Sequence, residues 1–495
     1  MGTPALAQEM CDRTLDALIL NRLEIAEAAP FNSLNDVLFS ADAKLYRRLI
    51  QEILPTVHLL DPACGSGNLL VALHQRLSEI YSILTGYMQQ IQGAQLTLWR
   101  ETPADKNNIE PIDAIDAIDA IELSDSTTEN PLQDIQKKVL RHNLYGVEML
   151  LGASETTRFQ LLLHTVATAR HPQELEPLVD LTFNIMTGNS LIGFITVDEE
   201  RFEQISTAGD VSILQGNLLQ PLAADSYQTI LAEKNLALEH YQHRNRALTE
   251  ASNIPDYAMD ALLRADILRL NAKAQHKLDR LLLNHMSQQL GIEYKAMQLT
   301  DKPQKQPLTL EDIDVLQPFH WGYHFSHIIK QGGFDAVLCV PPWGALKPTP
   351  TEFFQRFQDL AAAKAIDAST LKTSKRALAT GDPEVTQAWL FYQNQYAYVT
   401  HYFYRSDQYA NQNPTANGKP VRHQLAQERL FTERCFNLLA PNGLGAVVLP
   451  EPLSKNAKAK KLQQLLQAID VPYDKLTGNS VVITHWIKPQ RVGVK

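Results

Sequence analysis

Residues 57–68, Val-His-Leu-Leu-Asp-Pro-Ala-Cys-Gly-Ser-Gly-Asn, form the stretch of the chain that decides its fold. Val57 to Leu60 predict a short buried strand, and the small residues after it predict a loop that leads into a helix. In an open α/β sheet, ligands bind beyond the carboxyl end of such a strand. Gly65 and Gly67 allow a tight turn and a close approach of the backbone to a ligand. One face of the following helix is marked by apolar residues at spacings of three and four: Leu70, Leu73, Leu77 and Ile80.

Further apolar segments predict the rest of a sheet. A helix is expected over residues 157–169, between two of these segments. Short apolar strands that alternate with helices predict a doubly wound, mostly parallel sheet in an α/β fold. The additional strands are expected at residues 144–148, 188–192, 334–339, 445–449 and 481–486.

Three insertions are expected to interrupt this core. Residues 92–137 are polar and acidic and hold a tandem Asp-Ala-Ile unit, which predicts a surface loop. Residues 350–425 combine helix with a tyrosine cluster at 392–404, for which packing is favoured over stacking on bases. Residues 196–330 predict an antiparallel helix pair packed on the core, because one apolar stripe recurs at helical spacing: Leu263, Ile267, Leu270, Ala274, Leu278 and Leu281.

Composition narrows the class of protein. The chain has 495 residues, 44% of them hydrophobic, and a net charge of −10, which excludes global disorder and argues against indiscriminate nucleic-acid binding. No metal site is expected, because the histidines show no ligand spacing and the four cysteines lie far apart. Neither a signal peptide nor an apolar run of about 18 residues is found, so we expect a cytoplasmic protein without membrane contact. Small buried thiols are the favoured interpretation of Cys64 and Cys339.

Asp61-Pro-Ala-Cys-Gly-Ser-Gly-Asn68 resembles the S-adenosylmethionine-binding motif of N6-adenine DNA methyltransferases, above all the type IIG restriction-modification and phage-defence enzymes. Residues 143–148, 184–192 and 319–343 resemble further motifs of that family in the same order, and the resemblance covers roughly residues 55–465. It implies a class I S-adenosylmethionine-dependent methyltransferase fold, which is Rossmann-like and doubly wound around a mostly parallel, seven-stranded sheet.

The resemblance also implies roles for individual residues. Glu148 matches the acid that binds the ribose hydroxyls of the cofactor, and Asn189 matches a residue that contacts its adenine. Val340, Pro341, Pro342 and Trp343 match the catalytic motif, which forms the pocket for an adenine extruded from the duplex. The full set of cofactor-binding residues implied is Asp61, Ala63, Gly65, Gly67, Asn68, Glu148 and Asn189.

Val340 departs from the family, whose catalytic motif begins with Asn, Asp or Ser. In the family, that side-chain oxygen and the carbonyl of the next residue, here Pro341, accept hydrogen bonds from the exocyclic amine. Valine has no acceptor, and the loss of one such preorganised contact costs about 3–4 kcal/mol of transition-state stabilisation. A catalytically silent subunit that binds cofactor or DNA in a defence complex is therefore the alternative function. Methylation of a glutamine amide in a protein is a third possible function and is less favoured.

Double-stranded DNA is the expected partner. No large target-recognition domain is found after the catalytic half, so sequence readout is expected from a separate specificity or nuclease subunit, from the insertions, or from a longer natural protein. A basic patch offers phosphate contacts, although a solvated helix face is its simpler interpretation. The patch comprises Lys455, Lys458, Lys460 and Lys461.

The expected organisation has six parts. An N-terminal helical segment precedes the cofactor-binding half, and the catalytic half is divided by the second insertion. The expected boundaries are 1–55, 56–195 with the loop 92–137, 196–330 for the helical insertion, 331–349 for the catalytic strand and loop, 350–425 for the second insertion, and 426–495 for the rest of the core.

Overall fold

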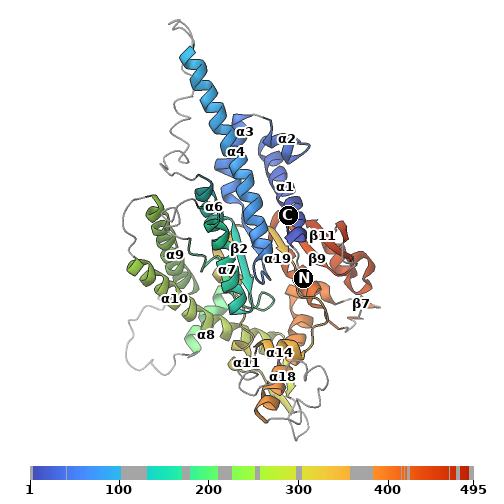
Figure 1. Cartoon of the computed structure of the whole chain (residues 1–495). Helices are drawn as coiled ribbons and strands as arrows, with labels where there is room; N and C mark the ends of the chain where they lie inside the picture. Colours follow the sequence, from blue (N-terminus) through green and yellow to red (C-terminus); the bar gives the residue numbers. More distant parts are fainter. Residues whose placement is uncertain are drawn as a thin grey trace.

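A computed structural model gives the structure of the chain. Figure 1 shows helices gathered around a central sheet, with the two ends of the described chain on the same side as the C-terminal strands. The residues described are 4–40, 42–101, 131–169, 179–209, 226–250, 257–296, 304–356, 383–413, 415–416, 419–420, 424–467, 469–474 and 480–489.

One seven-stranded sheet forms the centre of the protein, with strand order β10-β11-β9-β6-β1-β2-β3. The neighbours from β9 to β3 pair in parallel, whereas β11 runs antiparallel to both β9 and β10. The fold is thus α/β with a mostly parallel sheet, as the apolar segments predicted. The strand bounds are β1 Leu59–Asp61, β2 Leu144–Glu148, β3 Ile185–Thr187, β6 Phe334–Cys339, β9 Leu439–Leu449, β10 Ile469–Asp474 and β11 Ser480–Ile487.

Alternate residues of the strands face two different helical layers, because successive side chains of a strand point to opposite faces. Leu59 and Leu338 belong to the core cluster that contains α1 (Pro4–Glu27), α4 (Asn68–Glu101), α6 (Pro131–His142) and α7 (Leu151–Val166). Their neighbours Leu60 and Cys339 belong to a second cluster. That cluster contains α12 (Trp321–His324), α13 (Ser326–Lys330), α19 (Gln427–Leu438) and α20 (Lys460–Leu466).

The N-terminal segment belongs to the core of the sheet domain. Helix α1 packs on α4, β6 and β9, and its buried face includes Leu15 and Leu18. Arg22 forms an ion pair with Asp335 at the start of β6. The other oxygen of Asp335 accepts a hydrogen bond from the backbone nitrogen of His58, 2.8 Å away. The Asp335 carboxylate therefore joins α1, β6 and the entry to β1. The remaining N-terminal elements are α2 (Leu34–Leu38), α3 (Ala43–Arg48), η1 (Leu49–Ile53) and η2 (Leu54–Thr56).

The helical insertion contains the expected helix pair, α9 (Tyr227–Glu250) and α10 (Tyr257–Asn284), which pack side by side (Figure 1). All members of the apolar stripe except Leu263 are buried. Lys234 of α9 is also buried, and its amino group donates hydrogen bonds to the carbonyls of Tyr323 and His324. The insertion also holds α8 (Glu199–Gly209), η6 (His285–Gln289), a hairpin of β4 (Glu293–Ala296) and β5 (Gln304–Pro307), and α11 (Leu310–Asp314).

The second insertion leaves and rejoins the core at a narrow antiparallel neck. The backbone nitrogen of Leu346 donates to the carbonyl of Leu425 over 2.8 Å, and that of Gln427 donates to Gly344 over 2.9 Å. Between these points lie α14 (Pro350–Arg356), α18 (Pro383–Arg405), η7 (Asp407–Gln412), β7 (Thr415–Ala416) and β8 (Lys419–Pro420). Packing explains most of the tyrosine cluster, since four members of α18 are buried: Tyr392, Tyr398, Tyr402 and Phe403.

Some expected elements differ from those observed. Residues 188–192 form a turn, and the strand lies just before them at Ile185–Thr187. The ends of the expected loop 92–137 are helical, at 92–101 in α4 and 131–137 in α6, while its Asp-Ala-Ile unit lies outside the described residues. Strand β10 was missed because it carries Pro472 and lies at the sheet edge, where proline is tolerated. Across the described ranges, no helix has the length and apolarity required to cross a membrane.

Candidate functional site

A cavity of about 720 Å³ lies at the carboxyl ends of β1, β2, β3 and β6. Its walls include residues 62–63 after β1, 148–150 after β2, 188–192 after β3 and 342–347 after β6. Of the site residues predicted from the sequence, the structure brings five to this cavity: Ala63, Glu148, Asn189, Pro342 and Trp343.

The glycine loop borders this cavity and is shaped by a residue distant in sequence. Gly65 and Gly67 have φ values of +55° and +94°, in the region that favours glycine. A Cβ on Gly67 would lie 2.9 Å from Cγ2 of Thr157, whereas a Cβ on Gly65 would meet no atom within 4 Å. The hydroxyl of Thr157 donates a 2.9 Å hydrogen bond to the carbonyl of Gly65. Thr157 therefore holds the loop from behind, and Gly65 faces open space. Asn68, at the end of the loop, is exposed and begins α4.

The carboxylate of Glu148 is fixed by backbone donors on both sides. Its Oε2 accepts a hydrogen bond from the nitrogen of Gly65 over 2.9 Å, and its Oε1 accepts one from Leu150 over 3.2 Å. A carboxylate has about four acceptor positions, so these two bonds leave capacity for two hydroxyl donors. Glu148 thus has a fixed orientation at the cavity wall and the capacity to bind a vicinal diol.

Asp61 lies behind the wall of the cavity, not on it. It is 2% exposed, and its Oδ1 accepts a 3.0 Å hydrogen bond from the nitrogen of Ala63. Burial raises the pKa of Asp61 to about 7, and the neighbouring charge of Glu148 acts in the same direction. The structure therefore places Asp61 as the support of the loop that carries Ala63, in place of the direct cavity contact expected from the sequence.

The turn at residues 188–192 is held by several parts of the chain. Oδ1 of Asn189 accepts a hydrogen bond from the nitrogen of Leu191 over 3.1 Å. Ser190 donates to the carbonyl of Pro62 over 2.5 Å and so joins this turn to the glycine loop. The carbonyl of Leu191 accepts bonds from the hydroxyl of Tyr409 and, over 2.7 Å, from Nη2 of buried Arg434.

Tyr409 and Arg434 are positioning residues that the sequence analysis missed. No local pattern in the sequence connects them to the turn at residues 188–192.

The catalytic loop does not present all of its residues to the cavity. Val340 is half-buried and packs with Trp343 against the core cluster that contains α1, while Pro341 is buried. Neither Val340 nor Pro341 is among the described residues that line the cavity. The indole nitrogen of Trp343 donates a 3.1 Å hydrogen bond to the carbonyl of Val448 in β9. This bond fixes the orientation of the indole ring at the cavity wall.

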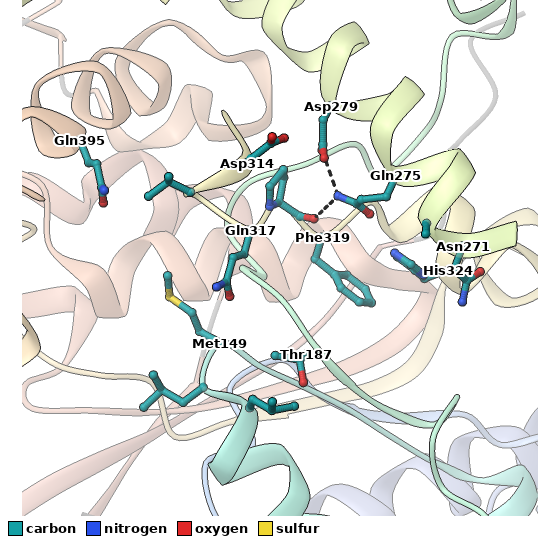
Figure 2. Close-up of a pocket in the computed structure, with 15 residues that line it drawn as sticks. Met149, Thr187, Asn271, Gln275, Asp279, Asp314, Gln317, Phe319, His324 and Gln395 are labelled. Atoms are coloured by element: carbon teal, nitrogen blue, oxygen red, sulfur yellow. Dashed lines mark hydrogen bonds between the residues drawn. The ribbon is translucent and has the colours of Figure 1, made fainter. Parts of the chain in front are cut away.

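A second cavity of about 890 Å³ lies between residues 149–151 and helix α10 (Figure 2). There the amide of Gln275 donates to Asp279 over 2.9 Å and to the carbonyl of Pro318 over 3.0 Å. None of the site residues predicted from the sequence lines this cavity. The smaller cavity is therefore the candidate site.

The basic patch lies beyond the carboxyl end of β9, at the same edge of the sheet as the candidate site. Three of its lysines are exposed, Lys461 is half-buried, and none lines the cavity. The exposed members are Lys455 in η8 (Leu453–Lys455), Lys458 in η9 (Ala457–Ala459) and Lys460 at the start of α20.

Cys64 and Cys339 are buried beside the site. Burial raises the pKa of both thiols well above the usual value, which disfavours the nucleophilic thiolate. In the part of the chain that the structure describes, no group of three His, Cys, Asp or Glu residues is placed to hold a metal ion.

We compared the chain with known proteins and found a similar protein that is named for its function. No family model matches the chain. Over 374 residues it is 21% identical to a protein of Methanocaldococcus jannaschii named "Putative type II restriction enzyme and methyltransferase". The match covers 69% of this chain but only 28% of that longer protein. This similarity supports a relationship between the chain and the methyltransferases of restriction-modification systems.

Proposed function

We propose that the chain is an S-adenosylmethionine-dependent DNA methyltransferase that transfers a methyl group to N6 of adenine in a restriction-modification or phage-defence system. One observation carries the proposal: Glu148, Asn189 and Trp343, from three separate motifs, line one cavity at the carboxyl edge of the sheet. The strand order and the helices on both faces support a class I methyltransferase fold.

The residues present fit the proposed cofactor. The fixed carboxylate of Glu148 suits the two ribose hydroxyls, and the open space beside Gly65 allows close approach of a ligand. Met149 and Leu150, which line the same cavity as Asn189, provide apolar surface for a purine ring. The volume of about 720 Å³ is typical of a small-molecule site.

The residues of this chain would act by positioning the cofactor and the base relative to each other. When bound, S-adenosylmethionine supplies an electrophilic methyl group. Glu148 would hold the ribose, and the indole of Trp343, fixed to Val448, would offer a stacking face to the extruded base. Holding the two reactants in line is a large part of such catalysis, and no covalent intermediate with the protein is required.

A catalytically silent subunit that binds cofactor or DNA is the second candidate. Val340 favours it, because its side chain has no acceptor and packs toward the core. Calorimetric titration with S-adenosylmethionine and S-adenosylhomocysteine tests cofactor binding, and transfer of tritiated methyl groups to mixed-sequence DNA tests activity.

If the chain is a methyltransferase, we expect heat of cofactor binding and transfer of tritium to DNA. If it is a silent subunit, we expect heat of cofactor binding without transfer of tritium. No heat with either ligand would contradict both. If wild-type protein transfers no tritium to DNA and Val340→Asn does, the missing acceptor oxygen alone explains the lack of methyltransferase activity.

Double-stranded DNA remains the proposed substrate. The relative is much longer than the matched region, so we propose that sequence readout comes from a further subunit or segment. The lysine patch at the site edge is the proposed contact to phosphates, because its exposed ammonium groups lie at the edge of the sheet where the base would enter.

A further inference from the structure

The second insertion contributes part of the wall of the candidate cavity. Leu346, Thr349 and Glu352 line it from the segment that enters the insertion, and Tyr396 and Val399 line it from α18. These residues share the cavity with Glu148 and Asn189 at the cofactor end. The insertion is therefore part of the binding chamber and supplies both apolar and polar groups to it.

A chain of hydrogen bonds fixes one carboxylate in this part of the wall. Tyr396 donates from its hydroxyl to Oε2 of Glu352 over 2.6 Å. The hydroxyl of Tyr392 lies 3.1 Å from that of Tyr396 and accepts a 3.3 Å bond from the nitrogen of Thr349. Burial, together with the charge of Glu352, raises the pKa of Tyr396, which keeps that hydroxyl protonated as a donor. Hydrogen-bonded side chains of this kind hold a group in one orientation.

The four residues of the catalytic motif, Val340 to Trp343, provide no side-chain acceptor to this cavity. Val340 packs against the hydrophobic core and has no acceptor, whereas an exocyclic amine requires an acceptor oxygen. Among the described residues that line the cavity, the carboxylates are those of Glu148 and Glu352. Glu148 is bonded to the glycine loop at the cofactor end, which leaves Glu352 for the substrate end.

We propose that Glu352, oriented by Tyr396, accepts a hydrogen bond from the exocyclic amine of the substrate base and replaces the acceptor that Val340 lacks. Apolar side chains of Val399, Phe403 and Phe431 in the same cavity provide surface for the flat ring. The inference rests on the proposed function, since it assigns an amine-bearing base to the same site.

The test compares two short single-stranded oligothymidylates, one with a central adenine and one with a central purine that has no exocyclic amine. Single strands avoid the energy of base extrusion from a duplex. Binding is measured by fluorescence anisotropy with full-length protein saturated with S-adenosylhomocysteine, which occupies the cofactor end. We expect wild-type protein to prefer the adenine strand by roughly tenfold or more, as for one hydrogen bond to a charged group.

Three variants and a matched control separate recognition from folding. Glu352→Ala should abolish the preference, Glu352→Gln should keep part of it through the amide oxygen, and Tyr396→Phe should reduce it by loosening Glu352. Glu384→Ala, an exposed position at the start of α18 outside the cavity lining, should leave it unchanged. Circular dichroism melting identifies a variant that fails to fold. If Glu352→Ala does not fold, the strand preferences of Tyr396→Phe and Glu352→Gln test the inference in its place.

Loss of preference in Glu352→Ala with partial retention in Glu352→Gln supports the inference. Equal binding of the two strands by wild-type protein, no binding of either strand, or a preference that survives in Glu352→Ala overturns it. Failure of the proposed function is a separate result, because it appears as no heat on titration of S-adenosylhomocysteine. In that case the comparison of strands is made with the protein alone.

Discussion

Alanine at Gly67 should mainly lower the stability of the protein, whereas alanine at Gly65 should mainly lower its affinity for the cofactor. At Gly67, with φ of +94°, an added Cβ lies 2.9 Å from Thr157 Cγ2 and 3.1 Å from its Cα. A left-handed non-glycine residue costs about 1–2 kcal/mol, and forcing a methyl group into a packed site costs about 1–3 kcal/mol more. We therefore expect Gly67→Ala to lower the free energy of unfolding by about 2–5 kcal/mol.

At Gly65, with φ of +55°, the added methyl group meets no atom within 4 Å, so there is no steric clash. The free energy of unfolding then falls only by the cost of the left-handed backbone, about 1–2 kcal/mol. The same methyl group would enter the space proposed for the cofactor. Gly65→Ala should therefore lose affinity for S-adenosylhomocysteine by at least about tenfold, roughly 1.4 kcal/mol, while its free energy of unfolding falls by only about 1–2 kcal/mol.

Urea unfolding measures stability and calorimetric titration measures affinity. A second substitution supplies the control: Thr157→Ser removes Cγ2 but keeps the hydroxyl, so it should recover part of the stability lost in Gly67→Ala. The reasoning is refuted if Gly65→Ala unfolds as easily as Gly67→Ala. It is equally refuted if Gly65→Ala binds the ligand as tightly as wild type.

Two other predictions concern pH and salt. The raised pKa of Asp61, about 7 in the folded protein against 3.8 as its usual value, means that the folded state holds this proton more tightly. The stability from that proton is present at low pH and is lost as pH rises toward 7, so urea unfolding should show about 2–3 kcal/mol lost between pH 5 and 7. Asp61→Asn should remove this slope, and an unchanged slope would contradict the pKa. Replacing Lys455, Lys458, Lys460 and Lys461 by alanine should weaken DNA binding and flatten its dependence on salt, whereas an unchanged slope in filter binding would leave the patch as a solvated face.

The site depends on contacts between distant parts of the chain. Ser190 joins the turn after β3 to the loop after β1, and Arg434 of α19 supports the same turn. A buried arginine that donates to a backbone carbonyl is costly to remove, because the acceptor then loses its partner. Segments of the sheet domain that are distant in sequence therefore hold the candidate site together.

The sequence by itself determined the elements and residue types that local patterns encode. Apolar runs predicted five of the strands close to their observed positions, and helical spacing predicted the buried faces of α4 and α10. The glycines of the loop and the acid at the end of β2 were also evident, because each belongs to a short, continuous string.

Only the tertiary structure decided which residues meet. It buried Asp61 behind Ala63, placed Thr157 against Gly67, turned Val340 toward the core and brought Glu352 into the cavity. Periodicity reports on which face of its own element a residue lies, whereas a cavity is closed by side chains far apart in sequence. Those meetings are set by how helices and insertions pack on the sheet, and no local pattern contains that information.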